Sequence, residues 1–369
     1  MDDIRVSTVF EEEYMYRYKI SLWKDDATRV SSGMFSFLYT RYGEGFIKTM
    51  ITGAVATPPE YRRNGYVRKI FDHAYEIAAQ EGALVALMHP FSFSYYHKFG
   101  YGKVADHLIV RCPIRLIDFV PRYNDLVPFT GTEEQLQDLI TVYNKFSEGR
   151  LLMMRRFNDR YFKNKKMYIY YEEGKPLGYI AYKEEKVLRT NHYEDGLLTV
   201  HELAYTTPGA LRALLGFIRM YEGELDDVEF ENISMCPEVE RCLTHYTHTR
   251  YRVLPDISAR ILDTEGILRA HKYPKEKGMF RIRVLDTLPK VAGSFQVEYG
   301  NGKCEVKRLN DNEEVQMTIE AAELVRLLYG YDLITPAQAA YTEGITIHGN
   351  IDDFFRAFPK MTGGMYEHF

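Results

Sequence analysis

One segment of the sequence combines a tight turn, two adjacent arginines and a glycine at the start of a predicted helix. Residues 55–65 read VATPPEYRRNG, which is neither a Walker A loop nor a Rossmann fingerprint. The first N–H groups of a helix have no partner within the helix, and the helix dipole adds partial positive charge there, so this turn suits a phosphate group. Gly65 would let a diphosphate approach the backbone because it has no Cβ. We therefore predict a diphosphate site along residues 63–68, with positive charge from Arg62, Arg63, Arg68 and Lys69. The alternative is an ordinary turn with surface arginines.

A hairpin, a helix and a buried strand must position this turn. The hairpin spans residues 34–57, turns at Gly43-Glu44-Gly45 and ends at Pro58-Pro59, because proline cannot donate to a ladder. Apolar residues recur at helical spacing over 67–78, and the apolar run 83–88 is typical of a strand buried on both faces. This order predicts a right-handed crossover and a parallel pair of strands.

A second block of the chain repeats this order. Residues 167–182 predict another hairpin, followed by a strand over 197–205, a helix from Pro208 and a strand over 228–235. The repetition indicates a duplicated fold. Thr206-Thr207-Pro208-Gly209 stands where the phosphate turn would be and has no arginine, so a second cofactor site is not expected.

The last stretch of the chain has a different order and predicts an α+β unit. Its Gly300-Asn301-Gly302 is a strong hairpin signal. The predicted strands are 279–285, 294–299, 303–309 and 317–319, and the predicted helices are 320–329 and 351–358.

Two segments carry a resemblance to a known family. Arg62 and Gly65 match the first and fourth positions of Q/R-x-x-G-x-G/A, the hallmark of motif A in the GCN5-related N-acetyltransferases (GNATs), whereas Val67 departs from the last position. Residues 90–102, PFSFSYYHKFGYG, follow the next strand. Together the two segments resemble the Eis (enhanced intracellular survival) family of bacterial acetyltransferases.

The resemblance implies a mixed α/β and α+β fold in three parts. These are a GNAT domain with an acetyl-CoA site over residues 1–120, a degenerate second GNAT-like domain over 121–274, and a sterol-carrier-like α+β domain over 275–369. Fold does not fix function, so the last domain need not bind a lipid.

The resemblance also implies acetyl-CoA as co-substrate and places it. The thioester carbonyl and the pantetheine arm would lie along the strand backbone at Val55, Ala56 and Thr57, and the next strand would splay at Phe91 and Ser92 to admit the arm. The diphosphate would lie on the turn, against Arg62, Arg63, Asn64, Gly65, Tyr66, Val67 and Arg68.

Acetyl transfer needs an acid for the leaving thiolate. A neutral tyrosine with a pKa of about 10 can donate to a thiolate whose thiol has a pKa of about 8.5. The resemblance assigns this acid to Tyr96. The residues alone leave Tyr95 and Tyr101 as candidates, and in a chain with 30 tyrosines the competing role is core packing.

The resemblance places the base at the end of the chain, in the α-carboxylate of Phe369. A carboxylate with a pKa of about 3.5 is too weak to deprotonate a free ammonium, but it can accept a proton from the tetrahedral intermediate, and burial would raise its pKa. His368 and Glu367 are rival bases, and fraying is the usual fate of a chain end.

Composition argues against several other classes of protein. The formal net charge of −5 and the pI of about 6.2 argue against a nucleic-acid partner. The chain has no run of about 18 apolar residues and no signal peptide, so we expect no membrane span. We also expect no metal and a cytoplasmic location, because no His/Cys/carboxylate cluster has metal spacing and the four cysteines are scattered, at Cys112, Cys236, Cys242 and Cys304.

The resemblance therefore predicts an acetyl-CoA-dependent N-acetyltransferase that acts by direct transfer. Its acceptor would be a primary amine of a small, polycationic molecule, aminoglycoside-like or polyamine-like, and the protein would form a hexamer. The alternative is a non-catalytic acetyl-CoA-binding sensor or scaffold, favoured by the section of only about 30 residues before Met34, which is shorter than in the family. A third hypothesis is that the C-terminal domain carries a lipid.

Overall fold

The computed structural model describes residues 3–12, 15–163, 165–188, 194–243, 245, 247–331 and 335–367. The chain divides into two compact units. Unit 1 contains the residues up to Ala105 and Asp256–Met361, and unit 2 contains Asp106–Pro255 and the tail from Thr362.

The first sheet of unit 1 has the strand order β1-β2-β3-β4-β5-β12. Its strands pair antiparallel except for β4 and β5, which run parallel and are connected through α1, as predicted. β1 and β2 precede the predicted hairpin, and the sequence did not reveal them. The bounds are β1 Asp3–Glu12, β2 Met15–Trp23, β3 Arg29–Tyr42, β4 Gly45–Ala56, α1 Tyr66–Glu81, β5 Val85–Met88 and β12 Arg250–Ile261.

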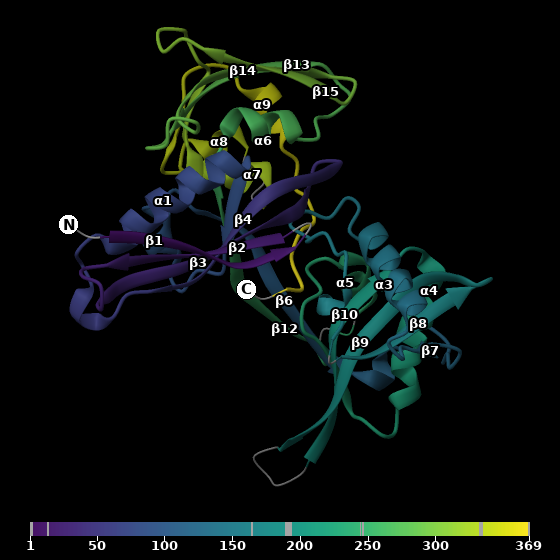
Figure 1. Ribbon diagram of the computed structural model, residues 1–369. Helices are drawn as coiled ribbons and strands as arrows, with labels where there is room; N and C mark the ends of the chain where they lie inside the picture. Colours follow the sequence, from purple (N-terminus) through teal and green to yellow (C-terminus); the bar gives the residue numbers. More distant parts are fainter. Residues whose placement is uncertain are drawn as a thin grey trace. The chain divides into compact units, whose positions relative to one another are not determined.

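Helix α1 lies along one face of this sheet (Figure 1). It buries the apolar face that the sequence predicted, with Ile70, Ala74 and Ala78 one turn apart and all fully buried. All four residues of β5 are buried, as predicted for a strand covered on both faces. This packing fixes both ends of the connection that contains the arginine-rich turn.

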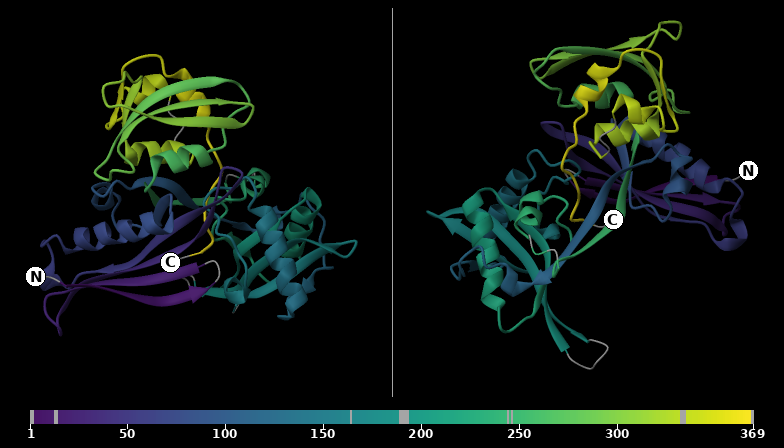
Figure 2. Two further views of the ribbon diagram at one scale, coloured as in Figure 1. Left: turned by 45° about the horizontal axis from the view of Figure 1, so that its top comes forward. Right: turned by 180° about the vertical axis from the view of Figure 1, so that it is seen from behind.

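The C-terminal part of unit 1 has a separate five-stranded sheet in the order β15-β14-β13-β16-β17. Its helices gather on one face of the sheet (Figure 2). The predicted turn is confirmed, since Asn301 and Gly302 have positive φ angles of 53° and 73°. The bounds are α6 Thr264–Ala270, β13 Gly278–Leu285, β14 Gly293–Gly300, β15 Lys303–Leu309, β16 Met317–Glu320, α7 Ala321–Leu328, α8 Pro336–Ala339, β17 Ile345–Ile347 and α9 Asp352–Ala357.

Unit 2 repeats the architecture of the first sheet, in the strand order β6-β11-β10-β9-β8-β7. β10 and β11 are parallel and are connected through α4, as β4 and β5 are connected through α1. The bounds are β6 Gly102–Pro113, η2 Ile114–Leu116, β7 Val127–Pro128, α3 Glu133–Phe146, η3 Asp159–Tyr161, β8 Lys166–Glu172, β9 Lys175–Leu188, β10 Glu194–Tyr205, α4 Pro208–Ile218, η4 Arg219–Tyr221, β11 Asp227–Phe230 and α5 Pro237–Cys242.

One strand of unit 2 is shorter than predicted. The sequence predicted a strand over 228–235, but β11 ends at Phe230. The side chain of Asn232 accepts a hydrogen bond from the Ser234 N–H at 3.1 Å, and this local turn replaces the ladder. α5 then begins at Pro237. Among the described helices of both units, none is long and apolar enough to cross a membrane.

Candidate active site

The turn between β4 and α1 presents open helix N–H groups. Gly65 is the N-cap residue of α1, has a φ of 74° and offers no side-chain hydrogen bond to the first turn. A Cβ at Gly65 would meet nothing within 4 Å, so the space above the helix terminus is empty. Arg63 also has a positive φ, of 65°. The helix terminus is thus uncapped and accessible, which is the geometry that a diphosphate requires.

This turn forms part of a pocket of about 720 Å³ in unit 1. The pocket brings together the end of β4, the start of α1 and the aromatic segment after β5. Four aromatic residues that were not predicted to bind the cofactor line it: Tyr61, Tyr95, Tyr96 and Phe99. Ten of the twelve predicted cofactor residues also line it, namely Val55, Ala56, Thr57, Arg62, Arg63, Gly65, Tyr66, Val67, Arg68 and Phe91.

The two remaining predicted residues, Asn64 and Ser92, lie outside this lining and make local hydrogen bonds. The Asn64 amide donates to the Tyr61 carbonyl at 3.1 Å, which ties the turn to itself. The Ser92 hydroxyl caps the short helix α2 (Phe93–His97) by accepting from the Tyr95 N–H at 3.3 Å. Sequence reasoning missed Tyr61 and Phe99 as lining residues, although both belong to the two segments that carried the resemblance.

The end of β4 contains a bulge. Ala54 has a φ of 48°, and the pairing register with β3 shifts between Ser32 and Met34, which marks a bulge. The parallel pairing with β5 covers Thr49–Ile51, whereas β4 continues to Ala56. The end of β4 therefore carries a bulge where it lines the pocket and extends beyond its pairing with β5, although Ala56 still pairs with Ser32 of β3.

Tyr96 is a buried tyrosine that lines the same pocket, and it is 6% exposed. Burial, followed by the neighbouring Tyr95 and Tyr101, raises the pKa of Tyr96 to about 12. Tyr95 also lines the pocket. The Tyr101 hydroxyl lies instead 3.4 Å from the hydroxyl of Thr52, and Tyr101 is not part of the lining. Of the three tyrosines that the sequence left as candidates for the acid, Tyr95 and Tyr96 therefore line the pocket and Tyr101 does not.

Two family models described as "Acetyltransferase (GNAT) domain" match the chain. One covers residues 8–104 and the other residues 151–261, which together is more than half of its length. The chain belongs to the GNAT acetyltransferases. It has two such domains in tandem and the separate C-terminal sheet described above. GNAT domains are those of acetyl-CoA-dependent N-acetyltransferases, so acetyl-CoA is the co-substrate that the family implies for this chain.

Solved structures have the same full-length architecture as this tandem GNAT protein. A GCN5-related N-acetyltransferase from Anabaena variabilis has a TM-score of 0.78 at 17% identity, over 95% of this chain and 89% of that chain. Eis1 from Mycobacterium abscessus has a TM-score of 0.79 at 15% identity, and a probable N-acyltransferase from Enterococcus faecalis has 0.79 at 17%, each over 100% of both chains. No curated protein matches the chain in sequence. The structural likeness establishes the Eis-like fold.

The second GNAT domain keeps a hollow of about 550 Å³ where β10 meets α4. Its chemistry differs from the first pocket. α4 begins at Pro208, which has no N–H, and the Thr207 side chain caps the Ala210 N–H at 3.1 Å. Two of the first three residues of α4 therefore offer no free N–H, whereas no side chain caps the first turn of α1.

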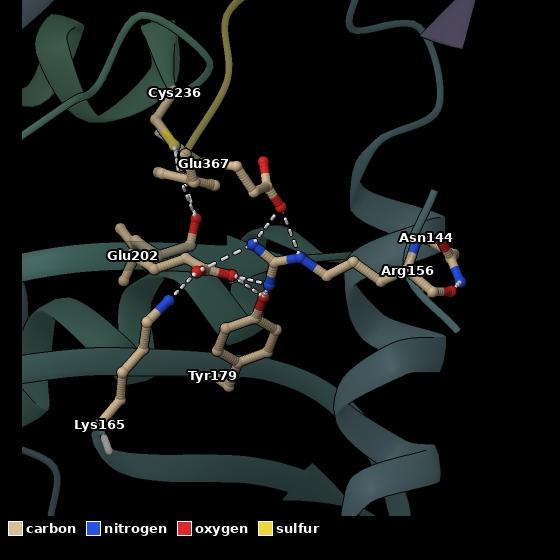
Figure 3. A network of polar contacts seen from close by, with 9 residues as sticks. Asn144, Arg156, Lys165, Tyr179, Glu202, Cys236 and Glu367 are labelled. Carbon is tan, nitrogen blue, oxygen red and sulfur yellow. Dashed lines mark hydrogen bonds and ion pairs between the residues drawn. The ribbon is translucent and has the colours of Figure 1, made fainter. Parts of the chain in front are cut away.

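The predicted base, Phe369, and its rival His368 lie outside the described residues. The other rival, Glu367, is described and is bound within unit 2. The Arg156 guanidinium donates to the Glu367 carboxylate at 2.9 Å through Nε and lies 2.8 Å from it through Nη2. Figure 3 shows the guanidinium between Glu367 and the buried Glu202. Glu367 is thus held in an ion pair.

The rest of the tail is held along unit 2 by backbone and side-chain contacts. The Leu151 N–H donates to the Thr362 carbonyl at 2.9 Å, and the Asn232 amide donates to the Met365 carbonyl at 3.2 Å. The Tyr366 hydroxyl donates to the Leu203 carbonyl at 2.9 Å. In the described part of the chain, no group of three or more His, Cys, Asp or Glu side chains is arranged to hold a metal ion.

Proposed function

We propose that this protein transfers the acetyl group of acetyl-CoA directly to a primary amine of a small, polycationic acceptor. The observation that carries the proposal is that one pocket is lined both by the open N-terminus of α1 and by the buried Tyr96. An open helix terminus suited to a diphosphate and a neutral acid in one cavity are two of the parts that acetyl transfer from coenzyme A requires.

The binding residues divide by chemistry. The N–H groups from Gly65 onward and the side chains of Arg62, Arg63 and Arg68 would hold the diphosphate. The Arg62 Nε donates to the Thr57 carbonyl at 3.1 Å, so this side chain is already oriented across the turn. The bulged end of β4, at Val55 and Ala56, and Thr57 directly after it would hold the pantetheine arm through their backbone.

Tyr96 would act as the general acid. Its pKa of about 12, caused first by burial, keeps the phenol protonated at neutral pH. As the amine nitrogen bonds to the carbonyl carbon and the carbon–sulfur bond breaks, Tyr96 would give its proton to the departing sulfur. Tyr95 is the weaker candidate because it is less buried than Tyr96. The ammonium proton would go to a carboxylate, for which the resemblance names Phe369.

The polycationic acceptor and the hexamer follow from the resemblance alone, and both stay predictions. The acceptor is found by a screen that measures thiol release with a panel of amines, and the assembly is measured by light scattering. Turnover in that screen separates an enzyme from an acetyl-CoA sensor, which would bind without releasing CoA.

Tyr96→Phe tests the acid, with Tyr95→Phe as the matched control. We expect Tyr96→Phe to lower kcat by about 10²-fold or more, because a general acid contributes about 10²–10⁴-fold. The Kd for acetyl-CoA should stay unchanged, since the ring remains in the pocket. Equal losses in the two variants, or no loss in either, would refute the role of Tyr96.

A further inference from the structure

Two glycines of the aromatic segment, Gly100 and Gly102, are in contact with residues far along the chain. A Cβ at Gly100 would lie 2.2 Å from the Arg260 Nη1 and 2.9 Å from the Asp286 Oδ2. Gly100 also has a φ of 78°, which L side chains rarely adopt. The residue is therefore required to be glycine by its backbone conformation and by the close approach of an ion pair.

Gly102 meets the C-terminal part of unit 1 in a second place. A Cβ there would lie 2.0 Å from the Ala322 carbonyl oxygen and 3.0 Å from the Val325 Cγ1, both in α7. The φ of Gly102 is not in the left-handed region. Its requirement for glycine therefore comes from the close approach of α7.

The ion pair behind Gly100 is buried. The Arg260 Nη2 donates to the Asp286 Oδ1 at 2.9 Å, and the two side chains are 3% and 5% exposed. Arg260 belongs to β12, and its guanidinium lies 4.7 Å from the centroid of the Tyr75 ring on α1. Asp286 follows β13 of the C-terminal sheet and also accepts from the Leu288 N–H at 2.8 Å. A well-packed hydrophobic pair at such a site is often as stable as an ion pair, so what the charges contribute here is a defined arrangement.

The turn that these contacts hold is the one that follows Tyr96. The N–H groups of Phe99 and Tyr101 donate to the Tyr96 carbonyl at 2.9 and 3.3 Å, and the Gly100 N–H donates to the His97 carbonyl at 2.8 Å. A displacement of Gly100 would thus be passed to the backbone of Tyr96 through two hydrogen bonds. A misplacement of about 1 Å in a reacting group can cost about 10²-fold in rate.

We infer that the C-terminal domain positions the acid of the acetyltransferase domain, with Asp286 and Arg260 as the positioning residues and α7 as the second support. The inference rests on the proposed function of Tyr96. It gives the FGYG string a physical meaning, because both of its glycines leave room for the C-terminal domain. It also gives that domain a role that needs no lipid.

Asp286→Asn tests the ion pair, and Glu265→Gln is the matched control. Glu265 makes an exposed ion pair with Arg269 at 2.7 Å on α6, so the control removes a carboxylate charge in the same part of the chain. We expect Asp286→Asn to lower kcat about tenfold or more, with the KM for acetyl-CoA within about twofold, and the control to change neither. Hydrogen exchange of the peptide over 93–102 should become faster in Asp286→Asn only.

Measuring the effect of Asp286→Asn with and without the Tyr96 hydroxyl distinguishes a positioning role of Asp286 from general damage to the fold. In a Tyr96→Phe background no acid is present to be misplaced, so Asp286→Asn should change the remaining kcat by less than about twofold. Gly102→Ala is the second variant, which covers the case that Asp286→Asn does not fold. We expect Gly102→Ala to lower kcat when Tyr96 is present and to have little effect in the Tyr96→Phe background.

The possible results bear differently on the inference and on the proposed function. Wild-type kcat in folded Asp286→Asn and Gly102→Ala overturns the inference, and so does an equal loss with and without the Tyr96 hydroxyl. An inactive wild-type protein, or an unaffected Tyr96→Phe, overturns the proposed function and with it the catalytic part of the inference. In that case faster hydrogen exchange of the 93–102 peptide in Asp286→Asn still supports the inference that the C-terminal domain holds the turn after Tyr96. Unchanged hydrogen exchange overturns it.

Discussion

Replacing Arg156 by methionine removes a guanidinium from the core of the second GNAT domain. Arg156 is 1% exposed, contacts both oxygens of Glu202 and holds Glu367 of the tail. Its guanidinium also lies 3.7 Å from the centroid of the Tyr143 ring. Methionine would occupy much of the volume but would leave both carboxylates without this partner. Lys165, 3.1 Å from Glu202, would be the remaining cation in the network.

The expected loss is large because the pair is buried. Removal of one partner from a buried ion pair costs about 3–5 kcal/mol, since the other charge stays uncompensated. Arg122→Met is the matched control in the same unit. Arg122 pairs with Glu222 at 3.0 Å, but the two side chains are 55% and 30% exposed. Such a pair contributes about 0–1 kcal/mol, so the control should stay close to wild type.

The effect of Arg156 should also depend on pH. Burial by itself would raise the pKa of Glu202, but the charges of Arg156 and Lys165 outweigh it and lower the pKa from 4.5 to about 2. A lowered pKa in the folded state contributes stability above pH 4.5, and this contribution is lost as the pH falls from about 4.5 to about 2. The full shift corresponds to about 3 kcal/mol, of which about 2 kcal/mol is lost by pH 3. The gap between wild type and Arg156→Met should therefore narrow at pH 3.

Urea denaturation followed by circular dichroism at pH 7 and at pH 3 measures both effects. The expected result is a free energy of unfolding lower by about 3–5 kcal/mol at pH 7 and a smaller difference at pH 3. A loss in Arg156→Met no larger than in Arg122→Met would refute the reasoning. A gap that is the same at both pH values would show that the charge of Glu202 is not what Arg156 stabilises.

Three further predictions concern the first domain and the chain end. Gly65→Ala and Gly82→Ala each place a Cβ at a positive φ, in otherwise empty space, at the two ends of α1. Each substitution should therefore lower the free energy of unfolding by about 1 kcal/mol. Only Gly65→Ala should also weaken acetyl-CoA binding, by about tenfold in the Kd measured by calorimetry. Because the pKa of Tyr96 is raised to about 12, Tyr96 should stay protonated up to pH 10, and the kcat of the wild type should not fall between pH 8 and 10 through loss of its proton. A fall in kcat over this range that is present in the wild type and absent in Tyr96→Phe would contradict the raised pKa. Two residues added after Phe369 should lower kcat and leave the KM for acetyl-CoA unchanged, and full activity of the extended protein would exclude the α-carboxylate as base.

The parts of the site that the sequence could predict are local in the chain. The predicted diphosphate site depends on a strand end, a turn and a helix start within residues 55–68. Each of these has its own residue signal: two prolines, a glycine and apolar helical spacing. The bound of β11 was predicted wrongly for an equally local reason, because the Asn232 side chain offers the backbone a turn where the apolar pattern alone suggests a strand. The aromatic segment could be found as a motif, but its role came only from resemblance.

The parts that sequence could not predict depend on long-range pairing. Arg156 meets a carboxylate 46 positions later and another 211 positions later, and Arg260 meets one 26 positions later in a different domain. No periodicity or turn signal in the chain marks these partners. β1 and β2 were missed for a related reason, since strand pairing rather than a local signal defines them.

Both buried arginines join segments that lie far apart in the sequence. Arg156 attaches the tail to the second GNAT domain, and Arg260 attaches the Tyr96 turn to the C-terminal domain. Apolar contacts could supply comparable stability, but they tolerate sliding by a fraction of a side chain, whereas a buried guanidinium has low energy only when its carboxylates are in place. We expect the charges to select one register in each case. Neither glycine of FGYG lines the pocket, so substitution of either glycine should lower kcat rather than weaken acetyl-CoA binding.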